Sequence, residues 1–222
     1  MEIRSAFHKK IREIQDDVVD MGSMVGKAIL LSIDALKKRD LDLARQIITD
    51  DQKINNKRFE IEEKCIHLIA TQQPMASDLR IIVAVLNIIT EVERIGDYAE
   101  GIAKIAVMIG DEPPLKPLID IPRMAEQTVD MLRRSLDAFC NHDADAARKI
   151  ALEDDLVDNL YNQVFRELLV FMMEDPRTVT RATRLLWVAH DLERGADRVT
   201  NICERVVFVV TGKMEEMGAS KY

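Results

Sequence analysis

Apolar residues recur along most of the chain at intervals of three and four, the spacing that places side chains on one face of an α-helix. Two of these apolar stripes are long: one runs from 81 to 109 and the other from 185 to 206. Stripes of this length are typical of helices that face the interior of a bundle. The alternating pattern and turn signals of β-strands are missing from the sequence. The pattern therefore predicts an all-α protein.

Aspartates and prolines divide this pattern into separate helices. Asp40 and Asp143 each stand where an N-cap is expected, directly before a helical segment. Pro74 and Pro176 interrupt the pattern, because proline breaks a helix interior. Long helices of this kind favour bundle packing. The predicted helices span residues 3–38, 41–70, 75–109, 118–140, 144–173 and 177–212.

The two halves of the chain repeat one another. Residues 32–47 align without a gap with residues 135–150, and the Ser, Asp, Ala, Arg and Ile positions recur. The segment 110–117 lies between the halves and holds half of the six prolines. We therefore predict two tandem, pseudo-symmetric three-helix bundles, residues 1–112 and 113–222, built from six long antiparallel helices.

Composition narrows the possible functions. The 222 residues carry a net charge of −8, which argues against a nucleic-acid-binding protein, since such proteins need a basic surface. No apolar run approaches the roughly 18 residues of a membrane-spanning helix, and the N-terminus does not resemble a signal peptide. The three cysteines fit neither a disulfide framework nor a zinc motif. We expect a cytoplasmic protein without direct membrane insertion.

Acidic side chains accompany the apolar stripes at matching places in both halves. Members of each pair lie four residues apart and so share a helix face. If two such helices face each other, each half gathers three or four oxygen ligands, which suits Mg²⁺, Ca²⁺, Mn²⁺ or iron. The candidate ligands are Asp51, Asn55, Glu93 and Asp97 in the first half and Asp154, Asp158, Glu193 and Asp197 in the second.

Other interpretations of these acids remain open. They could form solvated faces that pair with Arg94 and Arg194, although their repetition favours a metal. A carboxylate-bridged di-iron enzyme would carry duplicated Glu-x-x-His motifs. Here His190 precedes Glu193 in the reverse order, and Thr90 stands at the matching position of the first half. A structural or metal-storage module without a signalling partner is the third possibility.

Three segments resemble the PhoU family of phosphate-signalling proteins. Residues 69–80 are similar to the family's linker between its second and third helices, and residues 93–103 and 193–204 resemble its acidic E-x-x-x-D signatures. The resemblance implies two similar bundles, each with a multinuclear site for iron, manganese, magnesium or zinc. Asn55 stands where the family commonly has an acid. The implied ligands are Asp51, Glu93, Asp97, Asp154, Asp158, Glu193, Asp197 and Asn201.

The resemblance also implies a role. Members of this family are cytoplasmic regulators that work at the inner face of the membrane with the phosphate ABC transporter. The expected partners are the ATPase subunit of the transporter, the phosphate-sensing histidine kinase and a second copy of the chain. We expect a negative regulator of the phosphate-starvation response that is not an enzyme.

Overall fold

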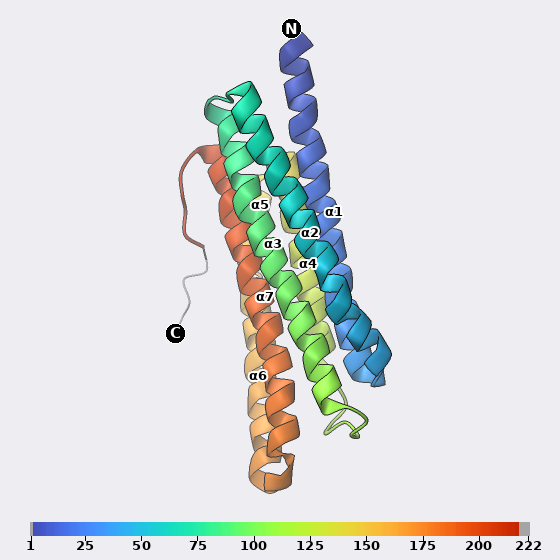
Figure 1. The fold of residues 1–222 in the computed structure, drawn as a ribbon. Coiled ribbons are helices and arrows are strands. Elements are labelled where there is room, and N and C mark those ends of the chain that lie inside the picture. Colours follow the sequence, from blue (N-terminus) through green and yellow to red (C-terminus); the bar gives the residue numbers. More distant parts are fainter. Residues whose placement is uncertain (1, 218–222) are drawn as a thin grey trace.

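The computed structural model describes residues 2–217, with side chains from Phe7 onward. This part of the chain contains helices and no strand, which confirms the predicted all-α class (Figure 1). The elements are α1 Glu2–Lys38, α2 Leu41–Gln72, α3 Ala76–Ile109, α4 Asp120–Asn141, α5 Ala144–Ala151, α6 Asp154–Glu174, the 3₁₀-helix η1 Pro176–Thr178, and α7 Val179–Thr211.

The helix ends follow the predicted signals. The Asp40 carboxylate accepts a hydrogen bond of 2.9 Å from the backbone N–H of Leu43, as an N-cap does. Asp143 accepts the equivalent bond of 2.9 Å from Ala146. Pro74 lies in the turn between α2 and α3, and Pro176 begins η1 directly before α7. The predicted N-caps and breaks are therefore confirmed.

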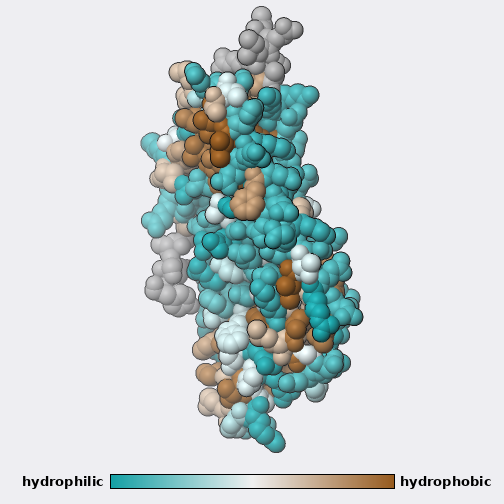
Figure 2. Space-filling model, viewed as in Figure 1, coloured by the Kyte–Doolittle hydropathy of each residue, from teal (hydrophilic) through white to brown (hydrophobic). Residues whose placement is uncertain are grey.

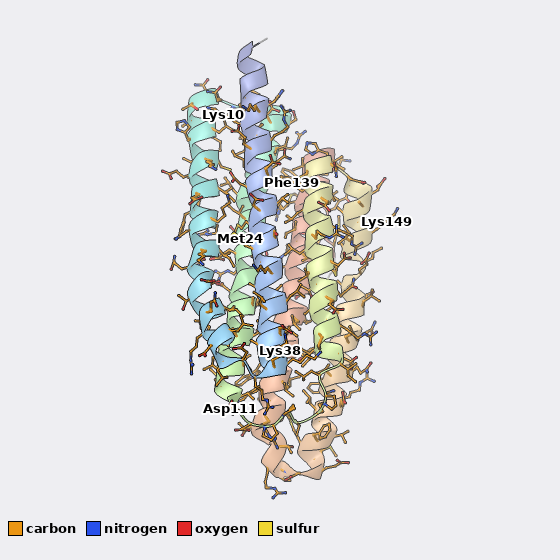
Figure 3. All side chains as sticks on the ribbon, turned by 90° about the vertical axis from the view of Figure 1, so that its right-hand side faces the viewer. Lys10, Met24, Lys38, Asp111, Phe139 and Lys149 are labelled. Atoms are coloured by element: carbon orange, nitrogen blue, oxygen red, sulfur yellow. The ribbon has the colours of Figure 1, made fainter. Side chains whose placement is uncertain are left out.

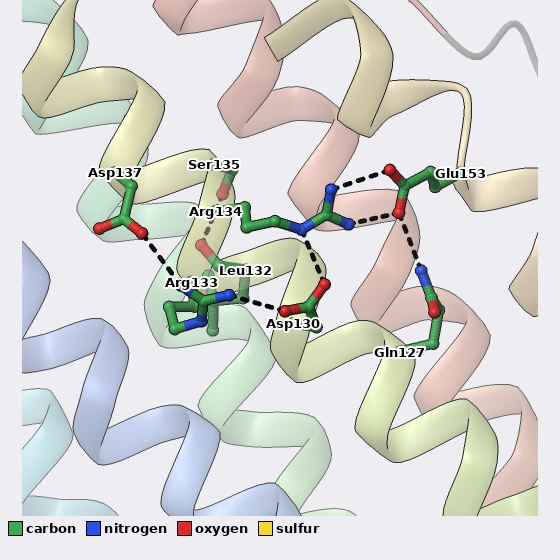
Figure 4. Close-up of polar contacts among 8 residues, drawn as sticks. All are labelled: Gln127, Asp130, Leu132, Arg133, Arg134, Ser135, Asp137 and Glu153. Atoms are coloured by element: carbon green, nitrogen blue, oxygen red, sulfur yellow. Dashed lines mark hydrogen bonds and ion pairs between the residues drawn. The ribbon is translucent and has the colours of Figure 1, made fainter. Parts of the chain in front are cut away.

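The predicted single helix over 144–173 is wrong, because α5 and α6 are separate helices with a break at residues 152–153. At this break Glu153 is bound by α4 (Figure 4). Arg134 Nη1 donates to Glu153 Oε1 over 2.9 Å, and Arg134 Nη2 donates to the other oxygen. Gln127 Nε2 also donates to Glu153, over 3.0 Å. The break coincides with these tertiary contacts and carries neither Pro nor Gly, so hydrophobic periodicity did not reveal it.

Two helical bundles lie side by side and share one hydrophobic core. Helices α1, α2 and α3 pack together, and α7 packs against α4, α5 and α6. Between the bundles α3 lies against α7, and α1 lies against α4 (Figures 1 and 3). The buried side chains of both bundles form a single continuous cluster. The two bundles therefore support each other through a wide seam.

The seam has an approximate two-fold symmetry. Helices α3 and α7 run antiparallel (Figure 1), and near the centre of the seam Ile95 lies against Gly195, the residue 100 positions later. The symmetry places equivalent positions of the two halves on either side of this centre. The contacts that define the arrangement are Glu91 with Arg198, Ile95 with Gly195, and Gly101 with Asp191.

The surface is mixed in character. Figure 2 shows a largely hydrophilic face with separate hydrophobic patches. Several large apolar side chains near the turn between α6 and α7 are exposed, among them Met173 and Trp187. Across residues 2–217, none of the helices combines the length and apolar character that crossing a bilayer requires.

Two acidic clusters as candidate metal sites

The first acidic cluster consists of Asp51 of α2 and Glu93, Asp97 and Glu100 of α3. Burial raises the pKa of Asp51, and the charges of Glu100 and Asp97 raise it further. The structure therefore brings these acids together from two helices, as the sequence predicted for three of them. Asn55 Nδ2 donates a 2.8 Å hydrogen bond to Asp51 Oδ2, so the amide is part of the same group.

Basic side chains compensate much of the first cluster. Arg94 Nη1 donates to Asp97 Oδ2 over 3.1 Å, and its Nε lies 3.8 Å from Glu93. Lys104 donates to Glu100 over 2.6 Å. The pKa of Glu93 is nevertheless raised, because burial and the charge of Asp97 outweigh the nearby arginines. Glu100 was not among the predicted ligands, although its position three residues after Asp97 places it on the same face.

The second acidic cluster consists of Asp154 and Asp158 of α6 and Glu193 and Asp197 of α7. Burial raises the pKa of Asp154 to about 7, with further contributions from the charges of Asp158, Asp197 and Glu193. Burial also raises the pKa of Glu193 to about 7, and here the charges of Asp197 and Asp158 add to it. All four predicted acids therefore influence one another electrostatically.

Two buried carboxylate oxygens of the second cluster accept no hydrogen bond in the described part of the chain, although one of them lies near a histidine. Asp154 Oδ1 and Glu193 Oε2 have no hydrogen-bond partner among the side chains and backbone that the structure describes. His190 Nδ1 lies 3.4 Å from Glu193 Oε2, and Arg194 Nη1 donates to Asp197 Oδ2 over 3.0 Å. Buried carboxylate oxygens that lack a donor are unfavourable unless a cation or a proton compensates them.

The two clusters differ in how their helices present the acids. Asp51 lies in the middle of the continuous helix α2, whereas Asp154 is the first residue of α6. Asp154 therefore follows directly after the break, at which Arg134 Nη1 donates to Glu153 Oε1. The repeat in the sequence predicted equivalent sites, and the structure makes them unequal.

Asn201 and Arg198 contact the opposite half across the seam. Asn201 Nδ2 donates to Glu91 Oε2 over 3.2 Å, and Arg198 Nη1 donates to the same oxygen over 3.3 Å. Glu91 was not among the predicted site residues. The feature of the sequence that could have revealed it is the acid at the matching position of the second half, Asp191. That Asn201 is a metal ligand remains a prediction. In the structure its side-chain amide donates a hydrogen bond to Glu91 across the seam.

Oxygen-rich donor sets fit a hard cation, and so do the two buried oxygens of the second cluster that accept no hydrogen bond from the described residues. Within the described part of the chain, however, no three acidic, histidine or cysteine side chains converge closely enough to hold a metal ion. Binding would thus require rotamer changes among these side chains. The predicted ligand sets therefore stay predictions.

Comparison with known proteins finds similarity to the same family in both halves of the chain. A family model described as the PhoU domain matches residues 18–106 and again residues 121–206. A relative from Aquifex aeolicus, named a phosphate-specific transport system accessory protein PhoU homolog, is 38% identical over 206 residues and 93% of each chain. The phosphate-specific transport system accessory protein PhoU of Escherichia coli is 36% identical over 211 residues, 95% of this chain and 88% of its own.

Solved structures show the same similarity in three dimensions. The phosphate transport system regulatory protein PhoU from Streptococcus pneumoniae superposes with a TM-score of 0.88 at 30% identity, over 95% of this chain and all (100%) of its own. PhoU from Pseudomonas aeruginosa superposes with a TM-score of 0.87 at 34% identity, over 93% of this chain and 100% of its own.

Proposed function

Because the chain belongs to the PhoU family of phosphate transport accessory proteins, we propose that it regulates phosphate uptake and represses the phosphate-starvation response. The relatives are named as accessory or regulatory proteins rather than as enzymes, which supports a regulatory role without catalysis. The names also link these proteins to a phosphate transport system. The proposed site of action is the cytoplasmic face of the membrane.

The proposed mechanism is conditional docking. Two acidic clusters on a rigid, repeated helical frame give the molecule a charged surface whose state can change. A change in that charge would favour or disfavour a partner, because charge complementarity controls both encounter and specificity. The proposed partners are the ATPase subunit of the phosphate transporter and the phosphate-sensing histidine kinase. The observation that carries this proposal is the pair of clusters at equivalent places in the two halves.

Metal binding is the proposed source of the charge change. Asp154, Asp158, Glu193 and Asp197 would hold an ion in the second cluster, and Asp51, Asn55, Glu93 and Asp97 would hold one in the first. A bound iron, manganese, magnesium or zinc ion supplies positive charge that neutralises the acids. Arg94 already forms ion pairs with Asp97 and Glu93 of the first cluster, and Arg194 forms one with Asp197 of the second. In this proposal the negative charge of these carboxylates is neutralised partly by the metal ion and partly by the arginines.

Two further features belong to the proposal. We propose that residues 1–112 and 113–222 are the two repeated units of the protein, which is supported by the internal repeat and by the twofold match to the family domain. We also propose that the protein forms a homodimer. A symmetric dimer would present four acidic clusters to its partners.

The regulatory role can be tested by deleting the gene and then supplying the natural or an altered chain. In a strain without it, a reporter of phosphate starvation should be expressed strongly even in phosphate-rich medium, and the natural chain should restore repression. A chain with D154N, D158N, E193Q and D197N should restore it poorly and should retain less metal in elemental analysis. The reason is that the cluster would lose most of the charge on which conditional docking depends.

A matched control removes the same amount of charge elsewhere. D42N, D145N, E63Q and E126Q alter four exposed acids and should leave repression unchanged. Repression that persists without the gene would contradict the regulatory role. Full repression by the cluster variant would contradict the part assigned to the acids.

A further inference from the structure

A cavity of about 240 Å³ lies where the two bundles are joined. Its walls come from the C-terminal ends of α1 and α3, from the connecting segment 111–119, and from the start of α7. Figure 3 marks this end of the molecule with Lys38 and Asp111. Both halves of the chain contribute to the walls, and neither acidic cluster does.

The inner surface of this cavity is mostly apolar. Leucine and isoleucine side chains from four different segments meet there, so an apolar group that enters is removed from water. Pockets for small ligands are typically of this kind, apolar with a few charged groups that fix orientation. The apolar lining residues are Leu36, Ile109, Leu115, Leu118 and Leu185.

The charged residues of the cavity are predominantly basic. Lys37, Arg39, Lys116 and Arg181 line it, and Glu112 is the single acid of the lining. The chain as a whole carries a net charge of −8, so this local excess of positive charge is contrary to the general balance. A positive pocket in an acidic protein attracts anions.

Helix electrostatics accounts for only part of this charge. Lys37 and Arg39 lie at the C-terminal end of α1, where the helix dipole favours cations. Arg181 lies in the first turn of α7, where the dipole disfavours a cation, and Lys116 lies outside any helix. The side chain of Lys116 is only 6% exposed and forms an ion pair with Glu167 of α6, which lies outside the cavity lining. This ion pair compensates the burial of the lysine.

The cavity walls are held in place before any ligand binds. Three prolines, at 113, 114 and 117, restrict the backbone of the connecting segment. Arg181 Nη1 donates to the carbonyl of Pro113 over 3.1 Å, and Arg39 Nη1 donates to the carbonyl of Asp111 over 3.3 Å. Arg181 Nε also lies 3.7 Å from Glu112 Oε2, and each guanidinium has further N–H donors beyond these contacts. A preformed pocket of this kind binds without a large ordering penalty.

We propose that this cavity binds a small organic anion, a phosphate or carboxylate group carried on a compact apolar body. A cavity of about 240 Å³ suits a ligand built on a single ring or a short branched chain. The apolar body packs on the leucines, and the anionic group binds Arg181 and Lys37 at the basic rim. Because the walls come from both halves, a bound anion stabilises the junction between the bundles.

The proposal is tested by titrating the full-length protein with phenyl phosphate, benzoate, inorganic phosphate and benzyl alcohol, using calorimetry and ligand-observed NMR. Phenyl phosphate or benzoate should bind, and inorganic phosphate and benzyl alcohol should bind at least about tenfold more weakly, since each lacks one half of the recognised chemistry. K37Q and R181Q should each weaken binding of the better anion about tenfold, because each removes a charged contact.

Arg184→Gln is the matched control, since it removes the same charge three residues after Arg181 on the same helix but outside the cavity lining. It should leave affinity unchanged. Lys37 is exposed, so K37Q keeps the test decisive if R181Q proves unstable. Absence of binding by both organic anions up to about 10 mM, or equal weakening by R184Q, would overturn the proposal.

Discussion

At the scale of single residues, an ionised carboxylate of the second acidic cluster destabilises the native state. Glu193 is 18% exposed, and its pKa of about 7 lies above the ordinary value of 4.5. A carboxyl group whose pKa is raised on folding binds its proton more tightly in the native state, so it destabilises the native state when ionised. That destabilisation is complete above about pH 7 and disappears below about pH 4.5.

We therefore expect metal-free protein to lose stability as the pH rises from about 5 to about 8. Glu193→Gln should increase the free energy of unfolding by about 1–2 kcal/mol at about pH 8 and should reduce the pH dependence. Urea denaturation in the presence of a chelator measures both effects. Glu63→Gln, at an exposed position of α2, should change neither. Equal stability of natural and E193Q protein at about pH 8 would contradict this account.

At the scale of elements, the break between α5 and α6 coincides with an ion pair to α4. The side chains of Arg134 and Glu153 are 31% and 29% exposed, and the hydrogen bond from Arg134 lowers the pKa of Glu153. The neighbouring pair on α4, Arg133 with Asp137, spans 3.2 Å and is 63% and 53% exposed. Figure 4 shows both pairs: Arg133, Arg134 and Asp137 lie on α4, and Glu153 lies at the break between α5 and α6. Solvent screens the second pair much more than the first.

A double-mutant cycle on each pair should separate them. For Arg134→Met and Glu153→Gln we expect a coupling energy of about 1.5–3 kcal/mol, because the ion pair is partly buried and has two hydrogen bonds. For Arg133→Met and Asp137→Asn the expected coupling is below about 0.5 kcal/mol. Chemical denaturation gives both values. Similar coupling energies for the two pairs would show that the break does not depend on Arg134.

At the scale of the whole molecule, the two bundles share one core. At the centre of the seam Gly195 lets α7 approach its neighbours closely, since an added Cβ would lie 3.3 Å from Thr128 Cγ2 and 4.0 Å from Ile95 Cγ2. A larger side chain there would push α7 away from α3 and α4. Damage at this point should therefore affect both bundles together.

We expect the protein to unfold in one cooperative transition. Trp187 fluorescence, which reports on the second bundle, and far-ultraviolet circular dichroism, which reports on all helices, should give the same urea midpoint. Gly195→Leu should lower both midpoints together, with a loss of about 2 kcal/mol from overpacking. Asn87→Leu, at an exposed position of α3, should have little effect. Separate midpoints for the two probes would contradict a shared core.

The sequence by itself determined the helical class, most helix ends and the residues of the acidic clusters except Glu100. These features depend on local spacing: apolar periodicity creates helix faces, an aspartate caps a helix from within its own turn, and proline disrupts a helix beyond its first turn. Asp40, Asp143, Pro74 and Pro176 all act in this way. Acids four residues apart share a face for the same reason.

Only the tertiary structure decided the features that depend on contacts between distant segments. The break at Glu153 accompanies its contacts with Arg134 and Gln127 of α4, and the partners of Glu91 come from the opposite bundle. The basic cavity likewise assembles residues from both halves. Spacing along one helix cannot show which side chain of another helix will face it, because that depends on how whole elements pack.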